Sequence, residues 1–180
     1  ASSTPGVGTC FTVSVSLKPA VEQSGRTKSV RNMSDKGRAV YAGQNKGFAG
    51  KRVLLAEDDP LNMEVIKRLL ENKGMIVERA GGGRTATAVF REKSADYYDV
   101  ILADYHMPQV DGLELARQVR GIEKDKHVLR PVPIIALTEN AFEEDMAGSF
   151  TGLISSGVSK PVDQVRLYDA LRWAFSQSHK

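Results

Sequence analysis

Acidic residues, a threonine and a lysine each follow a short apolar run in this 180-residue sequence. They are Glu57, Asp58 and Asp59 after residues 53–56, Asp104 after 98–103, Thr138 after 133–137, and Lys160 after 157–159. Clustered carboxylates repel one another unless a cation lies among them, and oxygen-only ligands select a hard ion such as Mg²⁺. A carboxylate can also attack phosphorus and form an acyl phosphate. The metal, the Lys160 ammonium and the Thr138 hydroxyl can then neutralise and position the transferred phosphoryl group.

The apolar pattern from residue 51 onward predicts strands and helices that alternate along the chain. Short apolar runs typical of parallel strands occupy residues 53–56, 75–77, 98–103, 133–137 and 157–159. Helical spacing follows each run, over residues 61–70, 85–91, 113–119, 140–147 and 165–175. Asp59 and Pro60 suit the start of the first helix and Gly74 its end. Five strands and five helices in this order predict an α/β fold with a doubly wound parallel sheet. Such a sheet brings the acids, Thr138 and Lys160 to the edge where ligands bind.

Four stretches of the sequence together match a known pattern. They read VLLAEDDPLN at 53–62, DVILADYHMPQVDG at 99–112, PIIALTENA at 133–141 and VSKP at 158–161. All four occur in order, and each lies at a predicted strand end. Residues 51–175 therefore resemble the receiver domain of two-component response regulators, in particular receivers attached to hybrid histidine kinases. The resemblance implies the flavodoxin-like receiver fold.

The resemblance also implies a metal site. Asp58 and Asp104 would bind Mg²⁺ through their carboxylates, and Glu57 would bind it directly or through water. The backbone carbonyl of His106 would complete the site, and we expect the His106 side chain to be exposed. Mn²⁺ is an alternative ion.

By the same resemblance, Asp104 is the phosphoryl acceptor, Thr138 hydrogen-bonds the phosphoryl group and Lys160 pairs with it. The donor would be a phosphohistidine on a histidine kinase domain or a histidine phosphotransfer protein. The signal would pass on through a conformational or interface change. This chain would catalyse only its own phosphorylation and dephosphorylation, whereas a parent hybrid kinase would be a phosphotransferase.

Two positions depart from the family pattern. Gly157 lies three residues before Lys160, where many receivers carry Tyr or Phe, and Glu139 follows Thr138 where a small residue is usual. The missing ring slightly favours a second interpretation, a docking module that binds proteins independently of phosphorylation. The complete acidic cluster favours the phosphorylated receiver.

Two other phosphate chemistries fit the sequence less well. A phosphohydrolase with an aspartate nucleophile needs a second acid two residues after it, and His106 occupies that position. Residues 81–85 are glycine-rich but lack the Gly-Lys-Ser/Thr ending of a phosphate-binding loop. We therefore expect a plain loop and helix start there.

The sequence divides into three predicted segments. Residues 1–19 contain a glycine-rich turn at 5–9 and an alternating strand pattern at 11–17, and they resemble the end of a histidine-kinase ATP-binding domain. Residues 20–50 have the composition of a flexible basic linker, although a partly helical arm packed on the domain is an alternative. Residues 51–180 would form the receiver domain.

Charge and composition limit the partners and the compartment. Residues 1–52 carry nine Lys and Arg against two Asp and Glu, a net charge of +7, whereas residues 53–180 carry a net charge of −4. The basic excess thus lies outside the predicted domain, and we expect no nucleic-acid partner. No apolar run reaches 18 residues, and the single Cys10 cannot form an internal disulfide. We expect a cytoplasmic receiver without membrane contact, whether or not a parent chain is membrane-anchored.

Overall fold

The computed structural model describes residues 2–4, 8–10, 47–94, 96–139 and 152–177, which fall into two compact units divided after Ser34. In the first unit, β1 (Ser2–Thr4) pairs antiparallel with β2 (Gly8–Cys10). Gly8 and Thr9 thus belong to a strand and not to the predicted turn. The strand predicted over residues 11–17 lies outside the described residues, so the remnant of a kinase domain stays a prediction.

The second unit contains a five-stranded parallel sheet. Its strands are β3 (Arg52–Ala56), β4 (Ile76–Ala80), β5 (Val100–Asp104), β6 (Ile134–Thr138) and β7 (Ser156–Ser159), in the order β4-β3-β5-β6-β7. Every residue of β5 and β6 is buried. Strands covered on both faces read as continuous apolar runs, which is why the sequence located them.

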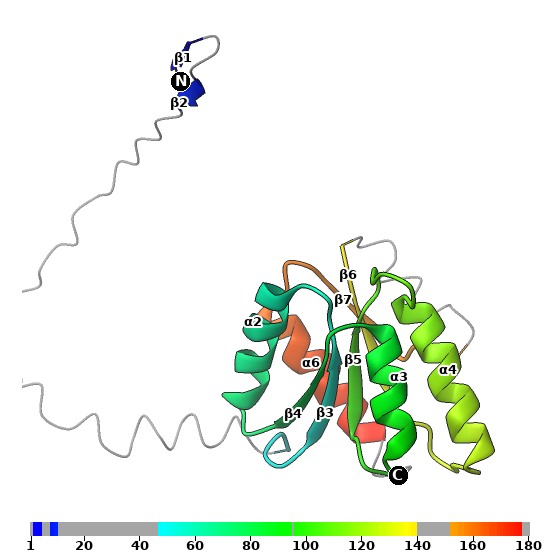
Figure 1. Ribbon diagram of the computed structural model, residues 1–180. Helices are drawn as coiled ribbons and strands as arrows, with labels where there is room; N and C mark the ends of the chain where they lie inside the picture. The colour runs from blue at the N-terminus through cyan, green and yellow to red at the C-terminus, as the bar shows by residue number, and fades with distance from the viewer. Residues whose placement is uncertain (1, 5–7, 11–46, 95, 140–151, 178–180) are drawn as a thin grey trace, which may run out of the picture. The chain divides into compact units, whose positions relative to one another are not determined.

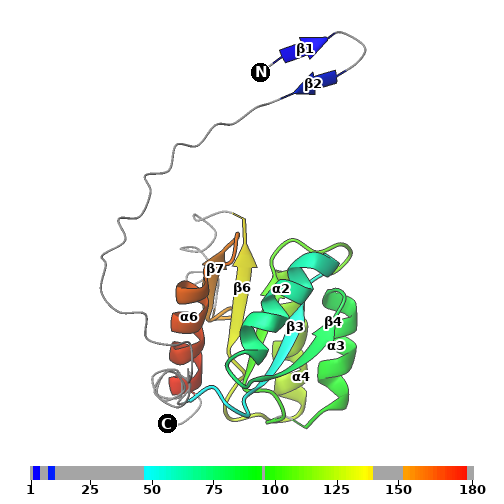
Figure 2. The same cartoon turned by 90° about the vertical axis from the view of Figure 1, so that its left-hand side faces the viewer.

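Helices cover both faces of this sheet, as the doubly wound prediction requires (Figures 1 and 2). The described helices are α2 (Pro60–Glu71), α3 (Gly83–Glu92), α4 (Gly112–Asp125) and α6 (Gln164–Gln177). Residues of α3 and α4 form one apolar cluster with the sheet, and residues of α2 and α6 form the other. The helix predicted over residues 140–147 lies outside the part of the chain that the structure describes.

Local capping explains where α2 begins and ends. The Asp59 side chain accepts hydrogen bonds from the backbone N–H groups of Leu61 and Asn62, at 2.9 and 2.8 Å, and Pro60 occupies the first turn. Gly74 has a φ of +80°, a left-handed conformation that favours glycine after a helix. The helix start at Asp59 and Pro60 is therefore confirmed.

The packed region begins before residue 51. Phe48 is 1% exposed and belongs to the apolar cluster of α2 and α6. Its ring centroid lies 5.6 Å from that of Tyr168 and 6.0 Å from that of Phe175. Gly50 donates its backbone N–H to the Gly74 carbonyl oxygen at 2.8 Å. Phe48 is thus packed on the receiver, whereas residues 20–46 lie outside the described residues, so the linker and its alternative, a packed arm, stay predictions.

Candidate phosphoryl-acceptor site

The predicted site residues lie at one edge of the sheet because all five strands run parallel. Glu57 and Asp58 directly follow β3, Asp104 and Thr138 are the last residues of β5 and β6, and Lys160 directly follows β7. Within the sheet, Asp104 is opposite Leu137 and Thr138 is opposite Ser159. The topology therefore places all these residues on the side where α/β sheets bind ligands.

Three carboxylates form the acidic part of the site. Oxygen atoms of Glu57, Asp58 and Asp104 all lie within 4.8 Å of one another. Glu57 is 1% exposed and Asp104 is 5% exposed, whereas Asp58 is exposed to solvent. Oxygen donors at this spacing, with one of them open to water, suit a hard cation that keeps part of its water shell, such as Mg²⁺. The donor set therefore fits the metal that the resemblance implies.

Lys160 bridges two of the three carboxylates. Its Nζ donates to Glu57 Oε2 at 2.9 Å and to Asp104 Oδ2 at 2.7 Å. Its backbone N–H donates to the Thr138 carbonyl oxygen at 2.6 Å, and the peptide bond to Pro161 is cis. The side chain is only 13% exposed. The ammonium therefore lies against the carboxylate that the sequence singles out as the acceptor.

Burial and neighbouring charges shift the pKa values of Glu57 and Lys160. Burial raises the pKa of Glu57, the neighbouring Asp104 carboxylate raises it further, and the Lys160 ammonium opposes the rise. Burial acts to lower the pKa of Lys160, but the hydrogen bonds to Asp104 and Glu57 outweigh burial and raise that pKa above its ordinary value. Lys160 therefore stays charged at neutral pH and remains a cation beside Asp104.

The two remaining predicted residues, Thr138 and His106, differ in their exposure to solvent. Thr138 is 1% exposed at the end of β6. His106 is exposed, as expected. Its backbone N–H donates to Asp104 Oδ1 at 3.2 Å, and its ring lies edge-on to Tyr105 at 5.1 Å. His106 thus contacts Asp104 through its main chain, and its side chain packs edge-on against Tyr105 at the surface.

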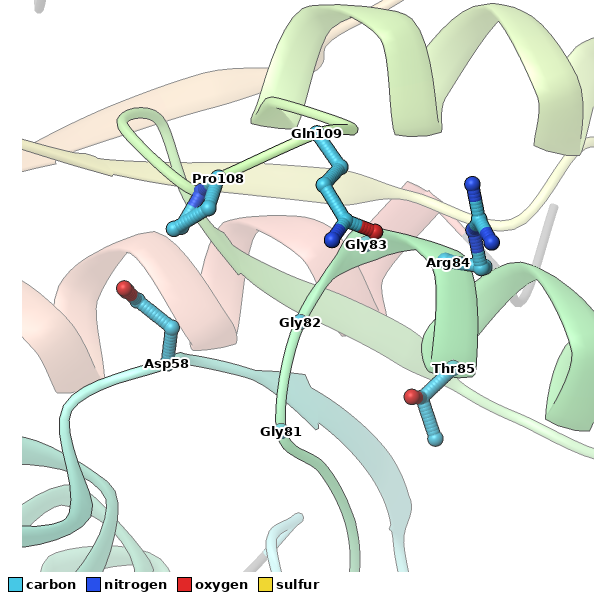
Figure 3. Close-up of a pocket in the computed structure, with 8 residues that line it drawn as sticks. All are labelled: Asp58, Gly81, Gly82, Gly83, Arg84, Thr85, Pro108 and Gln109. Carbon is cyan, nitrogen blue, oxygen red and sulfur yellow. The ribbon is translucent and has the colours of Figure 1, made fainter.

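A pocket of about 180 Å³ adjoins Asp58, and the sequence did not predict it. Its walls are residues 81–85, Pro108 and Gln109, which face each other in Figure 3. The glycine-rich run at 81–85 was the signal that could have drawn attention to it. Gly83 is the first residue of α3, so the expected loop and helix start is confirmed.

Residues 53–172 match the family model of the response regulator receiver domain. The chain belongs to this family. Among curated relatives, the peroxide stress-activated histidine kinase mak3 of Schizosaccharomyces pombe is 38% identical over 123 residues, which cover 68% of this chain and 5% of that protein. Hybrid signal transduction histidine kinase L of Dictyostelium discoideum is 32% identical over 121 residues, which cover 67% of this chain and 7% of that protein. The chain thus spans less than a tenth of the length of these two kinases.

Solved structures agree with the family. The receiver domain of sensor histidine kinase PA1611 from Pseudomonas aeruginosa, crystallised with a magnesium ion coordinated in the active site cleft, is 33% identical. The match covers 70% of this chain and 98% of that domain, with a TM-score of 0.58. The receiver domain of Ssk1 from Saccharomyces cerevisiae, crystallised with the histidine phosphotransfer protein Ypd1, is 25% identical with a TM-score of 0.63. That match covers 72% of this chain and 92% of that domain.

No described helix is long and apolar enough to cross a membrane.

Proposed function

We propose that this receiver accepts a phosphoryl group on Asp104 from a phosphohistidine, in a reaction that depends on Mg²⁺. The observation that carries the proposal is the position of Lys160, whose ammonium contacts Asp104 and Glu57 beside Asp58. A buried carboxylate that is held by a cation, beside an acid that is exposed to solvent, suits a nucleophile toward phosphorus.

The metal would be held by Glu57, Asp58, Asp104 and the backbone carbonyl of His106. The PA1611 receiver, with magnesium in its active site cleft, supports this assignment. Mn²⁺ is an alternative because carboxylate and carbonyl oxygens suit both ions. When bound, the ion neutralises negative charge on the phosphoryl oxygens.

The chain's own residues then have distinct roles in the transfer. An Asp104 carboxylate oxygen attacks phosphorus, the phosphorus–nitrogen bond to the donor histidine breaks, and the electron pair returns to the imidazole nitrogen. The Lys160 ammonium, already beside Asp104, pairs with one phosphoryl oxygen. The Thr138 hydroxyl donates to another. Hydrolysis ends the signal: a water oxygen attacks phosphorus, the phosphorus–oxygen bond to Asp104 breaks, its electron pair returns to the carboxylate, and inorganic phosphate and a proton are released.

The donor would be a histidine kinase domain or a histidine phosphotransfer protein. The complex of Ypd1 with the Ssk1 receiver supports a phosphotransfer protein, and the kinase relatives support a kinase domain. Phosphorylation would change the conformation or an interface of the receiver and so pass the signal on. A hybrid histidine kinase is the proposed parent.

A second candidate is a docking module that works without phosphorylation. The observation in its favour is Gly157, which lies in β7 opposite Ala136 and offers no aromatic ring beside Thr138. The two candidates differ in whether Asp104 can be phosphorylated at all.

Intact mass after incubation with acetyl phosphate distinguishes them. The wild-type chain should gain a single phosphate adduct that requires Mg²⁺, and Asp104→Asn should gain none. Asp125→Asn, an exposed acid at the end of α4, is the matched control and should behave as wild type. A folded wild-type chain that gains no adduct with Mg²⁺ present would contradict the proposal and favour the docking module.

A further inference from the structure

The loop that follows the acceptor is closed at its base. Residues 105–111 connect β5 to α4, and Gly112 donates its backbone N–H to the Tyr105 carbonyl oxygen at 3.0 Å. A Cβ at Gly112 would lie 3.0 Å from the Tyr105 Cα and would overlap the Asp104 carbonyl oxygen. The base of the loop is therefore packed too closely for a side chain at this position.

The end of the loop that leads into α4 packs against a second glycine. Gly83, the buried first residue of α3, faces Val110. A Cβ on Gly83 would overlap the Val110 carbonyl oxygen and would lie 2.7 Å from Val110 Cγ1 and 2.9 Å from Val110 Cβ. The overlap is with backbone and with the start of a branched side chain. Neither can turn away as the end of a flexible side chain can, so any side chain at Gly83 must displace α3 or the loop.

Helix α3 is the better anchored of the two. Thr87 Oγ1 lies 3.0 Å from the Gly83 carbonyl oxygen and 2.8 Å from Gln118 Oε1 on α4. Ala86 and Phe90 are buried in the core at 0% and 3% exposure. On the loop, Pro108 and Gln109 are exposed and adjoin the pocket of about 180 Å³ (Figure 3). The exposed part of the loop therefore has room to move, whereas Met107 and α3 are held in the core.

We propose that Gly83 is a positioning residue for the acceptor site, because its missing side chain sets the path of the loop that carries His106 and adjoins Asp104. This inference rests on the proposed function for its effect on phosphorylation. Mg²⁺ requires near-ideal ligand geometry, and a displacement of about 1 Å near reacting groups costs roughly 100-fold in rate. Gly83 contacts neither the metal nor the phosphoryl group and acts only through the loop.

Gly83→Ala tests the inference, with Gly81→Ala as its matched control. Gly81 is in the same connection, has no left-handed φ, and an added Cβ there meets nothing within 4 Å. In the metal-free protein, the NMR amide signals of His106 and Val110 should move in Gly83→Ala and stay in place in Gly81→Ala. By calorimetry, Mg²⁺ should bind Gly83→Ala roughly tenfold more weakly, and phosphorylation by acetyl phosphate should slow by at least as much.

The outcomes separate this inference from the proposed function. If Gly83→Ala keeps wild-type amide signals and Mg²⁺ affinity, or if Gly81→Ala changes them equally, the inference is wrong. If the wild type gains no phosphate, the proposed function fails, yet the amide and Mg²⁺ measurements still decide the role of Gly83. Should Gly83→Ala not fold, Val110→Ala tests the same contact from the loop, because it removes the Cγ1 atom that faces Gly83. It should move the His106 amide signal and weaken Mg²⁺ binding a few-fold, and unchanged signals and affinity would overturn the inference.

Discussion

Lys160 brings a positive charge to the carboxylate cluster. Its ammonium donates to both Glu57 and Asp104, and those two carboxylates are almost completely buried. A buried carboxylate that loses its partner keeps its desolvation cost without compensation. Lys160 therefore contributes to the stability of the fold as well as to the proposed chemistry.

Lys160→Met, which keeps an apolar stem and removes the charge, should lower the free energy of unfolding at pH 7 by about 1–3 kcal/mol. Urea denaturation of the metal-free protein measures this change. Lys124→Met, at an exposed position in α4, is the control and should change stability little. Equal stability of Lys160→Met and the wild type would show that the ion pairs contribute nothing net.

The sequence predicted that Asp104, Thr138 and Lys160 meet at one edge of the sheet, because each one ends or directly follows a strand. A buried parallel strand is an apolar run, so Asp104, Thr138 and Lys160 could be placed at one edge from the pattern alone. The sequence could not show that Lys160 contacts two carboxylates, because such contacts depend on side-chain distances between segments far apart in the chain. Lys160 and Glu57, for example, are 103 residues apart. The role of Gly83 was equally hidden, because a close backbone approach leaves no periodic pattern.

At the scale of elements, a tyrosine connects β4 with the segment that enters β5. Tyr98 is 5% exposed and donates its hydroxyl to Glu78 Oε2 at 2.6 Å, and its ring stacks on Phe90 at 6.1 Å. Burial raises the pKa of Tyr98 well above its ordinary value, and the Glu78 carboxylate raises it further. The phenol therefore stays protonated in the folded chain at pH values where it ionises in the unfolded chain.

Tyr98→Phe should cost about 1 kcal/mol of unfolding free energy at pH 7, since it removes one buried hydrogen bond. The unfolded phenol ionises near pH 10.0, whereas the folded one holds its proton, so wild-type stability falls as the pH rises through 10. Phe cannot ionise. The difference in unfolding free energy between the wild type and Tyr98→Phe should therefore become smaller above pH 10. Urea denaturation at pH values between 7 and 11 measures it.

Tyr97→Phe is the control for this prediction. The Tyr97 ring lies under Arg52 and Lys93, and no described hydrogen bond involves its hydroxyl. Both contacts survive in Phe, so its stability should follow the wild type at pH 7. If the difference in unfolding free energy between the wild type and Tyr98→Phe stays constant with pH, the Tyr98 hydroxyl does not resist ionisation in the folded chain.

Element boundaries were predicted less well than element types. The second strand was predicted over residues 75–77 but is Ile76–Ala80, because Glu78 and Arg79 interrupt the apolar run. This strand is at the edge of the sheet, where polar side chains reach solvent. The third strand was predicted from residue 98, but it begins at Val100. Tyr98 is buried by packing against α3 and not by the sheet ladder.

At the scale of the whole molecule, the receiver core extends beyond the residues that the family match covers. The match begins at residue 53, yet Phe48 is buried between Tyr168 and Phe175 of α6. The Arg172 guanidinium also lies 5.5 Å from its ring centroid. The composition of residues 20–50 suggested a linker, and one aromatic residue among polar neighbours gives no pattern that reveals burial.

Phe48→Ala should therefore lower the free energy of unfolding by about 3–5 kcal/mol, the range for removing a buried phenylalanine side chain. A chain that starts at Lys51 should lose as much relative to one that starts at Gly47, because it lacks the same ring and the Gly50 hydrogen bond to Gly74. Leu129→Ala, at a side chain that is 95% exposed, is the control. If the chain from Lys51 proves as stable as the chain from Gly47, Phe48 only covers the domain and the boundary at residue 51 holds. If it proves weaker by the expected amount, the last residues of the predicted linker are part of the receiver core.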